Sequence, residues 1–291
     1  MARLVHVDGE LVPIDRATVS IQDRGFRYGD ALFETMRAYG GELFEWDAHW
    51  DRLQRGSETI GLDHGLAQGD AAARIQETLA ANEFSDAYVR LSVTRGVQGG
   101  RLTPAPTTDP TTIIVTEPLP RGGTRGQSIW DAPATCAIVD TAHVSSEALP
   151  SHLKSHNYLN GILAKREAAK QDADEALLLD DRGYLTEGTT TNLFFVDHGT
   201  LRTPAPTDHP LLPGITRRVV LELAEEQGIP VDVGSCQPGA LTEASEVFVT
   251  NTTWEVRPVT AVDNHTYSVG GVTQQLISAF DERVELAYID A

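Results

Sequence analysis

All lysines of the chain lie in the stretch SHLKSHNYLNGILAKREAAK, as Lys154, Lys165 and Lys170. Every other member of the 23 Lys and Arg residues is an arginine. A lysine that loses its proton in a desolvated site can attack a carbonyl group and form a Schiff base, which an arginine cannot do. Lys154 precedes a predicted helix, whereas Lys165 and Lys170 lie on its polar side. Lys154 is therefore the candidate nucleophile, with an ordinary surface lysine as the alternative.

Three further stretches carry groups that could hold a phosphorylated pyridine ring. YLTEGTTTNLFFV places Glu187 at the end of a predicted strand, where a carboxylate can keep the pyridinium nitrogen of pyridoxal phosphate protonated. LLPGITRRVV places Ile215 and Thr216 at a helix start, which favours phosphate. VTNTTWEV supplies hydroxyl and N–H donors around Thr252. Each stretch alone also fits a solvated turn or a plain cap, so the prediction depends on their occurring together.

Strands and helices mix along the chain without strict βαβ alternation, which favours an α+β fold. RLVHVDGELVPI predicts a hairpin that turns at Asp8-Gly9. A helix is expected over DAHWDRLQRGSETIGL, with Asp47 as its cap. EPLPRGGTRGQ mixes Pro, Gly and charge and is the best linker candidate. We predict a smaller N-terminal domain over 1–117, a linker over 118–125, and a larger domain over 126–291 that carries Lys154 and Glu187.

The composition argues against several classes of protein. With 42 acidic and 23 basic residues, the net charge is −19, which disfavours nucleic acid and anionic membranes as partners. The acidic residues are spread along the chain, as in proteins adapted to high salt, although an ordinary acidic protein is the alternative. The sequence has no long apolar run and no signal-peptide core, so a cytoplasmic protein is expected. Cys136 and Cys236 lack metal-ligand spacing, and no metal is expected.

From DRGFRYGDALFETMRAYGG to NTTWEVRPV, the chain resembles the class IV (fold type IV) pyridoxal-phosphate aminotransferases. This family includes branched-chain aminotransferases, D-amino acid aminotransferases and aminodeoxychorismate lyases. The stretch EALLLDDRGYLTEGTTTNLFFV, which follows the lysine helix, is the most specific part of the resemblance. It implies a homodimeric two-domain enzyme with a smaller N-terminal α/β domain and a larger barrel-like α/β domain.

The resemblance also implies roles for particular residues. Lys154 would form the Schiff base and move a proton, Glu187 would pair with the ring nitrogen, and Tyr158 would bind the ring hydroxyl. Phosphate contacts would come from Arg52, Ile215, Thr216 and Thr252. Substrate contacts would come from Arg90, Arg27 and Thr253. Asn192 is expected only to shape the turn after Glu187.

The substrate is less specified than the cofactor. Transamination between an amino acid and a 2-oxo acid is the main prediction, with glutamate and 2-oxoglutarate as the default pair and branched-chain amino acids as the second. The loop TRGVQGGRLTP resembles the carboxylate-binding loop of D-amino acid aminotransferases, but Arg101 is displaced by one residue and no histidine follows. A lyase that releases 4-aminobenzoate and pyruvate is the first alternative, and a non-catalytic acidic binding protein is the remote one.

Overall fold

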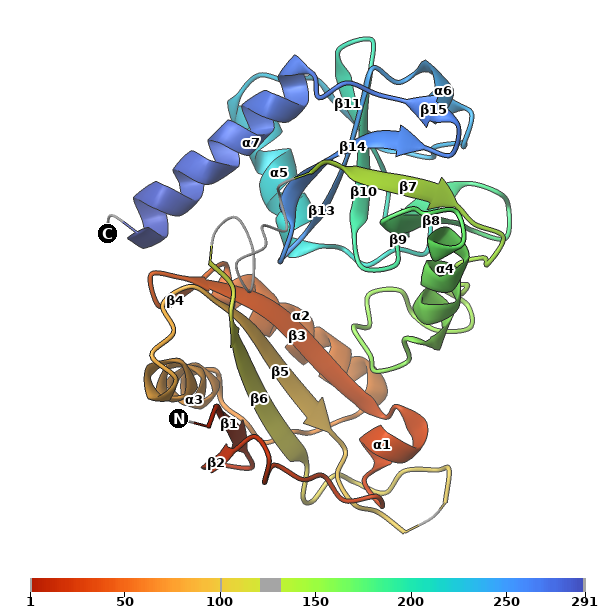
Figure 1. Cartoon of the computed structure of the whole chain (residues 1–291). Helices are drawn as coiled ribbons and strands as arrows, with labels where there is room; N and C mark the ends of the chain where they lie inside the picture. The colour runs from red at the N-terminus through yellow and green to blue at the C-terminus, as the bar shows by residue number, and fades with distance from the viewer. Residues whose placement is uncertain (1, 100, 121–131, 290–291) are drawn as a thin grey trace. The chain divides into compact units, whose positions relative to one another are not determined.

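The computed structural model describes residues 2–99, 101–120 and 132–289 and divides into two compact units (Figure 1). The first unit comprises Met1–Gln127 and Leu153–Asn157, and the second comprises Ser128–His152 and Tyr158–Ala291. Most of the predicted linker, from 121 onward, lies outside the described residues, so the domain limits stay a prediction. The five residues around Lys154 belong to the first unit, whereas the sequence alone assigns them to the larger C-terminal domain.

The first unit contains one antiparallel sheet in the order β2-β1-β6-β5-β3-β4. Its strands are β1 (Leu4–Val7), β2 (Glu10–Pro13), β3 (Ala31–Tyr39), β4 (Glu42–Leu43), β5 (Ala87–Thr94) and β6 (Thr111–Pro118). The predicted hairpin turn is confirmed, because Asp8 and Gly9 have φ angles of 48° and 101°. Two adjacent positive φ angles are what a tight hairpin of right-handed twist requires.

Three helices accompany this sheet: α1 (Arg24–Tyr28), α2 (Trp46–Ile60) and α3 (Gln68–Ala81). Helix α2 packs on β3, and α3 packs on β1 and β6. The buried face of α2 includes His49, Arg52, Leu53 and Gly56, whose spacing of three and four residues forms one stripe. The predicted cap is wrong, because the helix begins after Glu45 and Asp47 lies inside the first turn.

The second unit contains a nine-stranded sheet. Its strands are β7 (Ala134–Ile138), β8 (Glu175–Leu179), β9 (Leu185–Gly188), β10 (Asn192–Asp197), β11 (Thr200–Pro204), β12 (Val231–Gly234), β13 (Glu246–Asn251), β14 (Glu255–Val262) and β15 (His265–Thr266). The order runs β10-β13-β14-β7-β8-β9, and β9 pairs again with β10. This pairing closes the strands into the predicted barrel-like arrangement and brings Glu187 opposite Asn192.

The helices of the second unit are α4 (Leu159–Ala169), α5 (Ile215–Glu226), α6 (Ala240–Glu243) and α7 (Gly271–Val284), followed by a π-helical turn, Glu285–Ile289. Figure 1 shows α4 beside β8, which it contacts. Small side chains make this contact, since Ala164 and Ala168 are fully buried. The apolar residues of the other face stay exposed by 68%, 53% and 44% at Leu159, Ile162 and Leu163.

The core of the second unit lies between the strands, where Phe194 and Phe248 stack with ring centroids 4.9 Å apart. Both cysteines are buried and free of disulfides. Among the described residues, no helix combines the length and hydropathy needed to cross a bilayer.

Candidate functional site

The backbone around Lys154 is joined to β3 in the first unit. The Phe33 N–H donates to the Lys154 carbonyl over 2.9 Å, and an antiparallel bridge pairs Leu32 with Ser155. Two extended segments that lie far apart in sequence thereby share hydrogen bonds, and this contact fixes the backbone from which the Lys154 side chain projects.

The Phe33 ring has two cationic side chains beside it. Arg90 Cζ lies 3.7 Å from the ring centroid, and Lys154 Nζ lies 4.7 Å from it. His156 meets the same ring edge-on, with centroids 5.6 Å apart. The pKa of His156 is lowered to about 4, first by burial and then by the charge of Arg90. The structure therefore brings the candidate nucleophile and a candidate carboxylate-binding arginine to one aromatic ring.

Arg52 projects from the buried face of α2 toward Glu34 of β3. Its Nε and Nη2 groups donate to the two Glu34 oxygens over 2.8 Å and 2.6 Å. His49 Nδ1 donates to the same carboxylate over 2.7 Å. Burial raises the pKa of Glu34, but Arg52 and His49 outweigh it and hold that pKa at about 2. This ion pair fixes the orientation of the guanidinium, and a phosphate contact from Arg52 stays a prediction.

His49 also shows that Lys154 lies near this buried network. Burial lowers the pKa of His49 despite the opposing effect of Glu34, and the charges of Arg52 and Lys154 lower it further. Three predicted residues of the first unit, Arg52, Arg90 and Lys154, therefore lie around the neighbouring positions Phe33 and Glu34.

Both carboxylate oxygens of Glu187 are hydrogen bonded in the second unit. The Asn192 side-chain amide and the Leu212 N–H donate to Oε2 over 3.2 Å and 3.0 Å. His143 Nε2 lies 3.0 Å from Oε1. The Asn192 amide also donates to the Leu212 carbonyl over 2.9 Å. Asn192 thus joins Glu187 to the loop before α5, a larger role than the sequence predicts.

The residue that precedes α5 has to be a glycine because of this same asparagine. A Cβ atom at Gly214 would stand 2.0 Å from Asn192 Oδ1. The φ of Gly214 is −65°, which any residue adopts, so the requirement is steric. The close approach holds the loop against the side chain that orients Glu187.

The start of α5 has the properties of an anion site. Within the described structure no side chain caps it, and its first turn contains no acidic residue. Ile215 and Thr216 are buried there. Leu212, which binds Glu187, precedes Ile215 by three residues, so the first helical N–H groups lie within about 10 Å of that contact. The neighbouring Arg217 is buried, and burial lowers its pKa to about 10 against the attraction of Glu187.

The predicted threonine turn connects β13 and β14 near the same place. Asn192, the first residue of β10, pairs with Glu187 on one side and Thr250 on the other, two residues before Thr252. The Asn251 side chain accepts hydrogen bonds from the Thr253 N–H and hydroxyl over 3.0 Å and 3.1 Å. A substrate carboxylate would have to compete with Asn251 for this N–H group.

Two other predicted residues stand at helix ends. Tyr158 is the half-buried N-cap residue of α4 in the second unit. Arg27 is exposed in α1 of the first unit, with its Cζ 5.0 Å from the Tyr28 ring centroid. Their contacts with cofactor and substrate stay predictions.

Sequence reasoning missed four residues that shape these sites: Phe33, Glu34, His49 and His143. A signal existed for two of them, because His49 and Arg52 share one face of a helix at i, i+3 spacing. Glu34 lies in a strand that is buried on nearly its whole length, and a buried carboxylate needs a partner. A single histidine after a strand gives no signal, so His143 could be found only in the structure.

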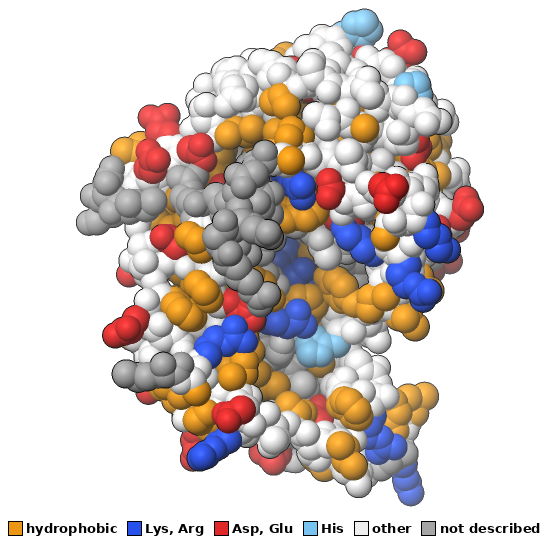
Figure 2. Space-filling view, in the orientation of Figure 1, with side chains coloured by type: hydrophobic (Ala, Val, Ile, Leu, Met, Phe, Trp, Pro, Cys, Tyr) orange, Lys and Arg blue, Asp and Glu red, His pale blue; other side chains and the backbone are white. Residues whose placement is uncertain are grey.

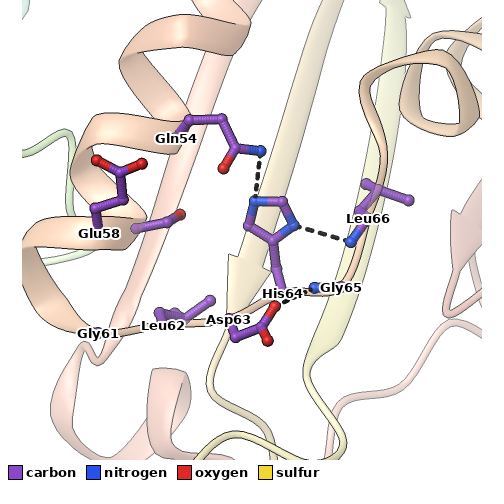
Figure 3. Close-up of a pocket in the computed structure, with 9 residues that line it drawn as sticks. Gln54, Glu58, Gly61, Leu62, Asp63, His64, Gly65 and Leu66 are labelled. Atoms are coloured by element: carbon purple, nitrogen blue, oxygen red, sulfur yellow. Dashed lines mark hydrogen bonds between the residues drawn. The ribbon is translucent and has the colours of Figure 1, made fainter.

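A hollow of about 420 Å³ lies beside the end of α2, away from the predicted site residues (Figure 3). His64 accepts a hydrogen bond from the Leu66 N–H at Nδ1 and faces the Gln54 amide with Nε2. Burial lowers the pKa of His64, so this ring is a neutral link between helix and loop. The described residues contain no group of three or more His, Cys, Asp or Glu that could hold a metal ion.

Comparison with known proteins gives the following similarities. Residues 31–262 match the family model described as amino-transferase class IV. A Methanocaldococcus jannaschii protein, provisionally named a branched-chain-amino-acid aminotransferase, is 36% identical over 281 residues, covering 96% of this chain and 95% of that protein. The D-alanine aminotransferase of Listeria monocytogenes is 32% identical over 292 residues, covering 97% of this chain and 96% of that protein.

A solved structure also resembles the whole chain. It is the branched-chain amino acid aminotransferase from T.th. complexed with N-(5'-phosphopyridoxyl)-L-glutamate. The TM-score is 0.89 at 28% sequence identity, and the match covers 100% of this chain and 96% of the other.

Proposed function

Because this chain belongs to the class IV aminotransferase family, we propose that it transfers the amino group of a branched-chain L-amino acid to 2-oxoglutarate. Class IV aminotransferases depend on pyridoxal phosphate, and we propose the same cofactor here. The observation that carries this proposal is the arrangement around Glu187. A bound carboxylate there stands next to an uncapped helix start that has no acid in its first turn.

The residues of the second unit fit pyridoxal phosphate. The Glu187 carboxylate offers an acceptor to a protonated ring nitrogen, and the first N–H groups of α5 with the Thr216 hydroxyl offer donors to a phosphate. The buried Thr250 hydroxyl lacks a hydrogen-bond partner among the described residues, so a polar group is still available beside Asn192. We assign the ring nitrogen to Glu187, the ring hydroxyl to Tyr158, and phosphate contacts to Ile215, Thr216 and Thr252.

The first unit supplies the reactive amine and two fixed cations. When bound, pyridoxal phosphate accepts the electron pair released at the Cα atom of the amino acid. Lys154 Nζ is the group we assign to holding the cofactor and to removing the Cα proton. Arg52 would bind phosphate with an orientation set by Glu34. Arg90, held against Phe33, would bind a substrate carboxylate.

The relatives support the choice of substrates. A branched-chain name accompanies the relative at 36% identity, and the solved relative is complexed with a phosphopyridoxyl derivative of L-glutamate. The D-alanine aminotransferase at 32% identity supports a second candidate, transamination of D-alanine. Arg27 and Thr253 are the residues we propose to contact the substrate together with Arg90.

A spectroscopic titration tests the proposal. The purified protein is reconstituted with pyridoxal phosphate, and its visible absorbance is followed while L-leucine, L-glutamate or D-alanine is added alone. Loss of the visible band with L-leucine and L-glutamate, restored by 2-oxoglutarate, is the expected result. Lys154→Ala should abolish this change, whereas Lys170→Ala, at an exposed position on the following helix, should leave it intact.

Other outcomes would redirect the assignment. A response to D-alanine alone would replace the L-amino acid proposal with the second candidate. Release of pyruvate from aminodeoxychorismate without a 2-oxo acid would favour the lyase. Absence of any visible band after reconstitution would overturn the cofactor.

We further propose a cytoplasmic homodimer with a salt-adapted surface. The exposed apolar face of α4 and Phe26, which is 74% exposed, support a second copy as a partner. Figure 2 shows acidic side chains spread over the visible face, in keeping with a net charge of −19. Sedimentation at several salt concentrations tests both proposals, and a monomer at every concentration would contradict the dimer.

A further inference from the structure

We propose that His143 is a positioning residue that carries a proton beside Glu187, keeping this carboxylate ionised and correctly oriented toward the ring nitrogen of the cofactor. The inference rests on the proposed function for the role of Glu187. The contact between the two side chains is independent of that function, because it lies wholly within the second unit.

The hydrogen-bond partners of His143 fix how many protons the pair holds. Nδ1 lies 2.9 Å from the Val144 carbonyl oxygen, and Nε2 lies 3.0 Å from Glu187 Oε1. A carbonyl oxygen only accepts hydrogen bonds, so Nδ1 carries a proton. The contact at Nε2 then needs a second proton, which belongs either to an imidazolium or to a protonated carboxyl group.

The remaining contacts of Glu187 place this proton on the histidine. Oε2 already accepts two N–H groups, one from Asn192 and one from Leu212. Donors to a carboxylate stabilise its ionised form. Burial lowers the pKa of His143, but the hydrogen bond and charge of Glu187, with the Val144 carbonyl, outweigh it and raise that pKa. The pair is therefore an imidazolium facing a carboxylate.

The surroundings of His143 leave Glu187 as the titratable partner that faces its ring among the described residues. The His143 N–H donates to the Leu179 carbonyl of β8. From α4, Asn160 donates to the Ala142 carbonyl, and Glu167 accepts from the N–H groups of 140 and 141 and the Thr141 hydroxyl. The side chain of His143 is 17% exposed, so little water can substitute for the contact.

Loss of the proton changes the contact from attractive to repulsive. Neutral His143 keeps its Nδ1 proton for Val144 and turns the lone pair of Nε2 toward Oε1. Glu187 then loses one of the three groups that orient it. The predicted effect of rising pH is a less well-oriented Glu187 and weaker protonation of the ring nitrogen that it binds.

The first test uses the apoprotein and needs no activity. Imidazole resonances are titrated by NMR in the wild type, in His143→Gln and in Glu187→Gln. The resonance that disappears in His143→Gln should titrate above the ordinary value of about 6.5. It should move down by at least about one pH unit in Glu187→Gln. A His143 resonance at or below the ordinary value would overturn the proposal.

The second test uses the reconstituted enzyme. His143→Gln keeps an N–H donor but cannot carry the charge, so kcat should fall by about 10–100-fold, the range for a hydrogen bond to a charged group. The alkaline limb that His143 contributes to kcat/KM should disappear as well. His265→Gln, at an exposed position of β15, is the matched control and should keep the wild-type profile.

An unchanged alkaline limb in His143→Gln would refute the proposed role. Failure of the proposed function would appear differently, as wild-type protein without a visible band after reconstitution. The NMR titration would still report the His143–Glu187 pair in that case, so the two failures can be distinguished.

Discussion

Replacing Gly214 by alanine should break the link between Glu187 and α5. The new Cβ would lie 2.0 Å from Asn192 Oδ1, whereas a real Cβ needs more than 3.0 Å, so the amide must move by about 1 Å or more. Its hydrogen bonds to Glu187 and to the Leu212 carbonyl, 3.2 Å and 2.9 Å long, cannot survive that displacement. A bond to a charged group contributes about 1.5–3 kcal/mol and a neutral one about 0.5–1.5 kcal/mol. We expect a loss of about 2–4 kcal/mol.

Urea unfolding of the apoprotein, followed by circular dichroism, measures this loss, and equilibrium dialysis measures the accompanying fall in pyridoxal phosphate affinity. Gly239→Ala is the matched control in the same unit, since its φ is −58° and no atom lies within 4 Å of the added Cβ. Such a substitution usually stabilises by about 0.4–1 kcal/mol. If Gly214→Ala were as stable as the control, the steric argument and the role given to Asn192 would both be refuted.

Three further predictions concern charge. Glu34→Gln should destabilise by about 3–5 kcal/mol because it leaves the Arg52 guanidinium buried without its carboxylate; Glu58→Gln on the exposed part of α2 is the control, and equal urea midpoints would contradict this. The pKa of Glu34 is depressed to about 2, so its contribution should be present above about pH 4.5 and be lost as the pH falls toward 2 in acid-unfolding curves. The pKa of His143 is raised, so its contribution should be complete below about pH 6.5 and be lost as the pH rises through the raised value; a stability difference between wild type and His143→Gln that grows with pH would show the opposite. With a net charge of −19, the unfolding midpoint should fall in low-salt buffer, where carboxylates repel one another unscreened, and an unchanged midpoint would remove the salt-adaptation proposal.

Local signals were sufficient wherever neighbouring residues set the structure. The Asp8-Gly9 turn, the strand that ends near Glu187 and the helix that begins at Ile215 all follow from turn chemistry, alternation and capping within a few residues. The family prediction is confirmed for the same reason, because its motifs are short and keep their spacing along the chain. The expected Asp47 cap failed because Glu45 adopts a left-handed conformation, which no local rule favours.

The face of α4 shows where a correct element still misled. The sequence predicts a helix with Leu159, Ile162 and Leu163 on one face, and these residues do form a helix. The buried positions are instead Ala164 and Ala168, because the closely placed strands β7 and β8 leave room only for small side chains. Periodicity identifies an apolar face, but it does not say which face a neighbouring strand will cover.

The sequence by itself determined which chemistry is present: one lysine before a helix, one carboxylate at a strand end, and a helix start without acid. Tertiary structure alone decided which partners these groups have. Lys154 joins β3 through a bridge between residues more than a hundred positions apart, and Glu187 meets His143 from 44 positions away. Such pairs depend on strand register and barrel closure, which are set by the packing of the whole chain and not by the residues next to either partner.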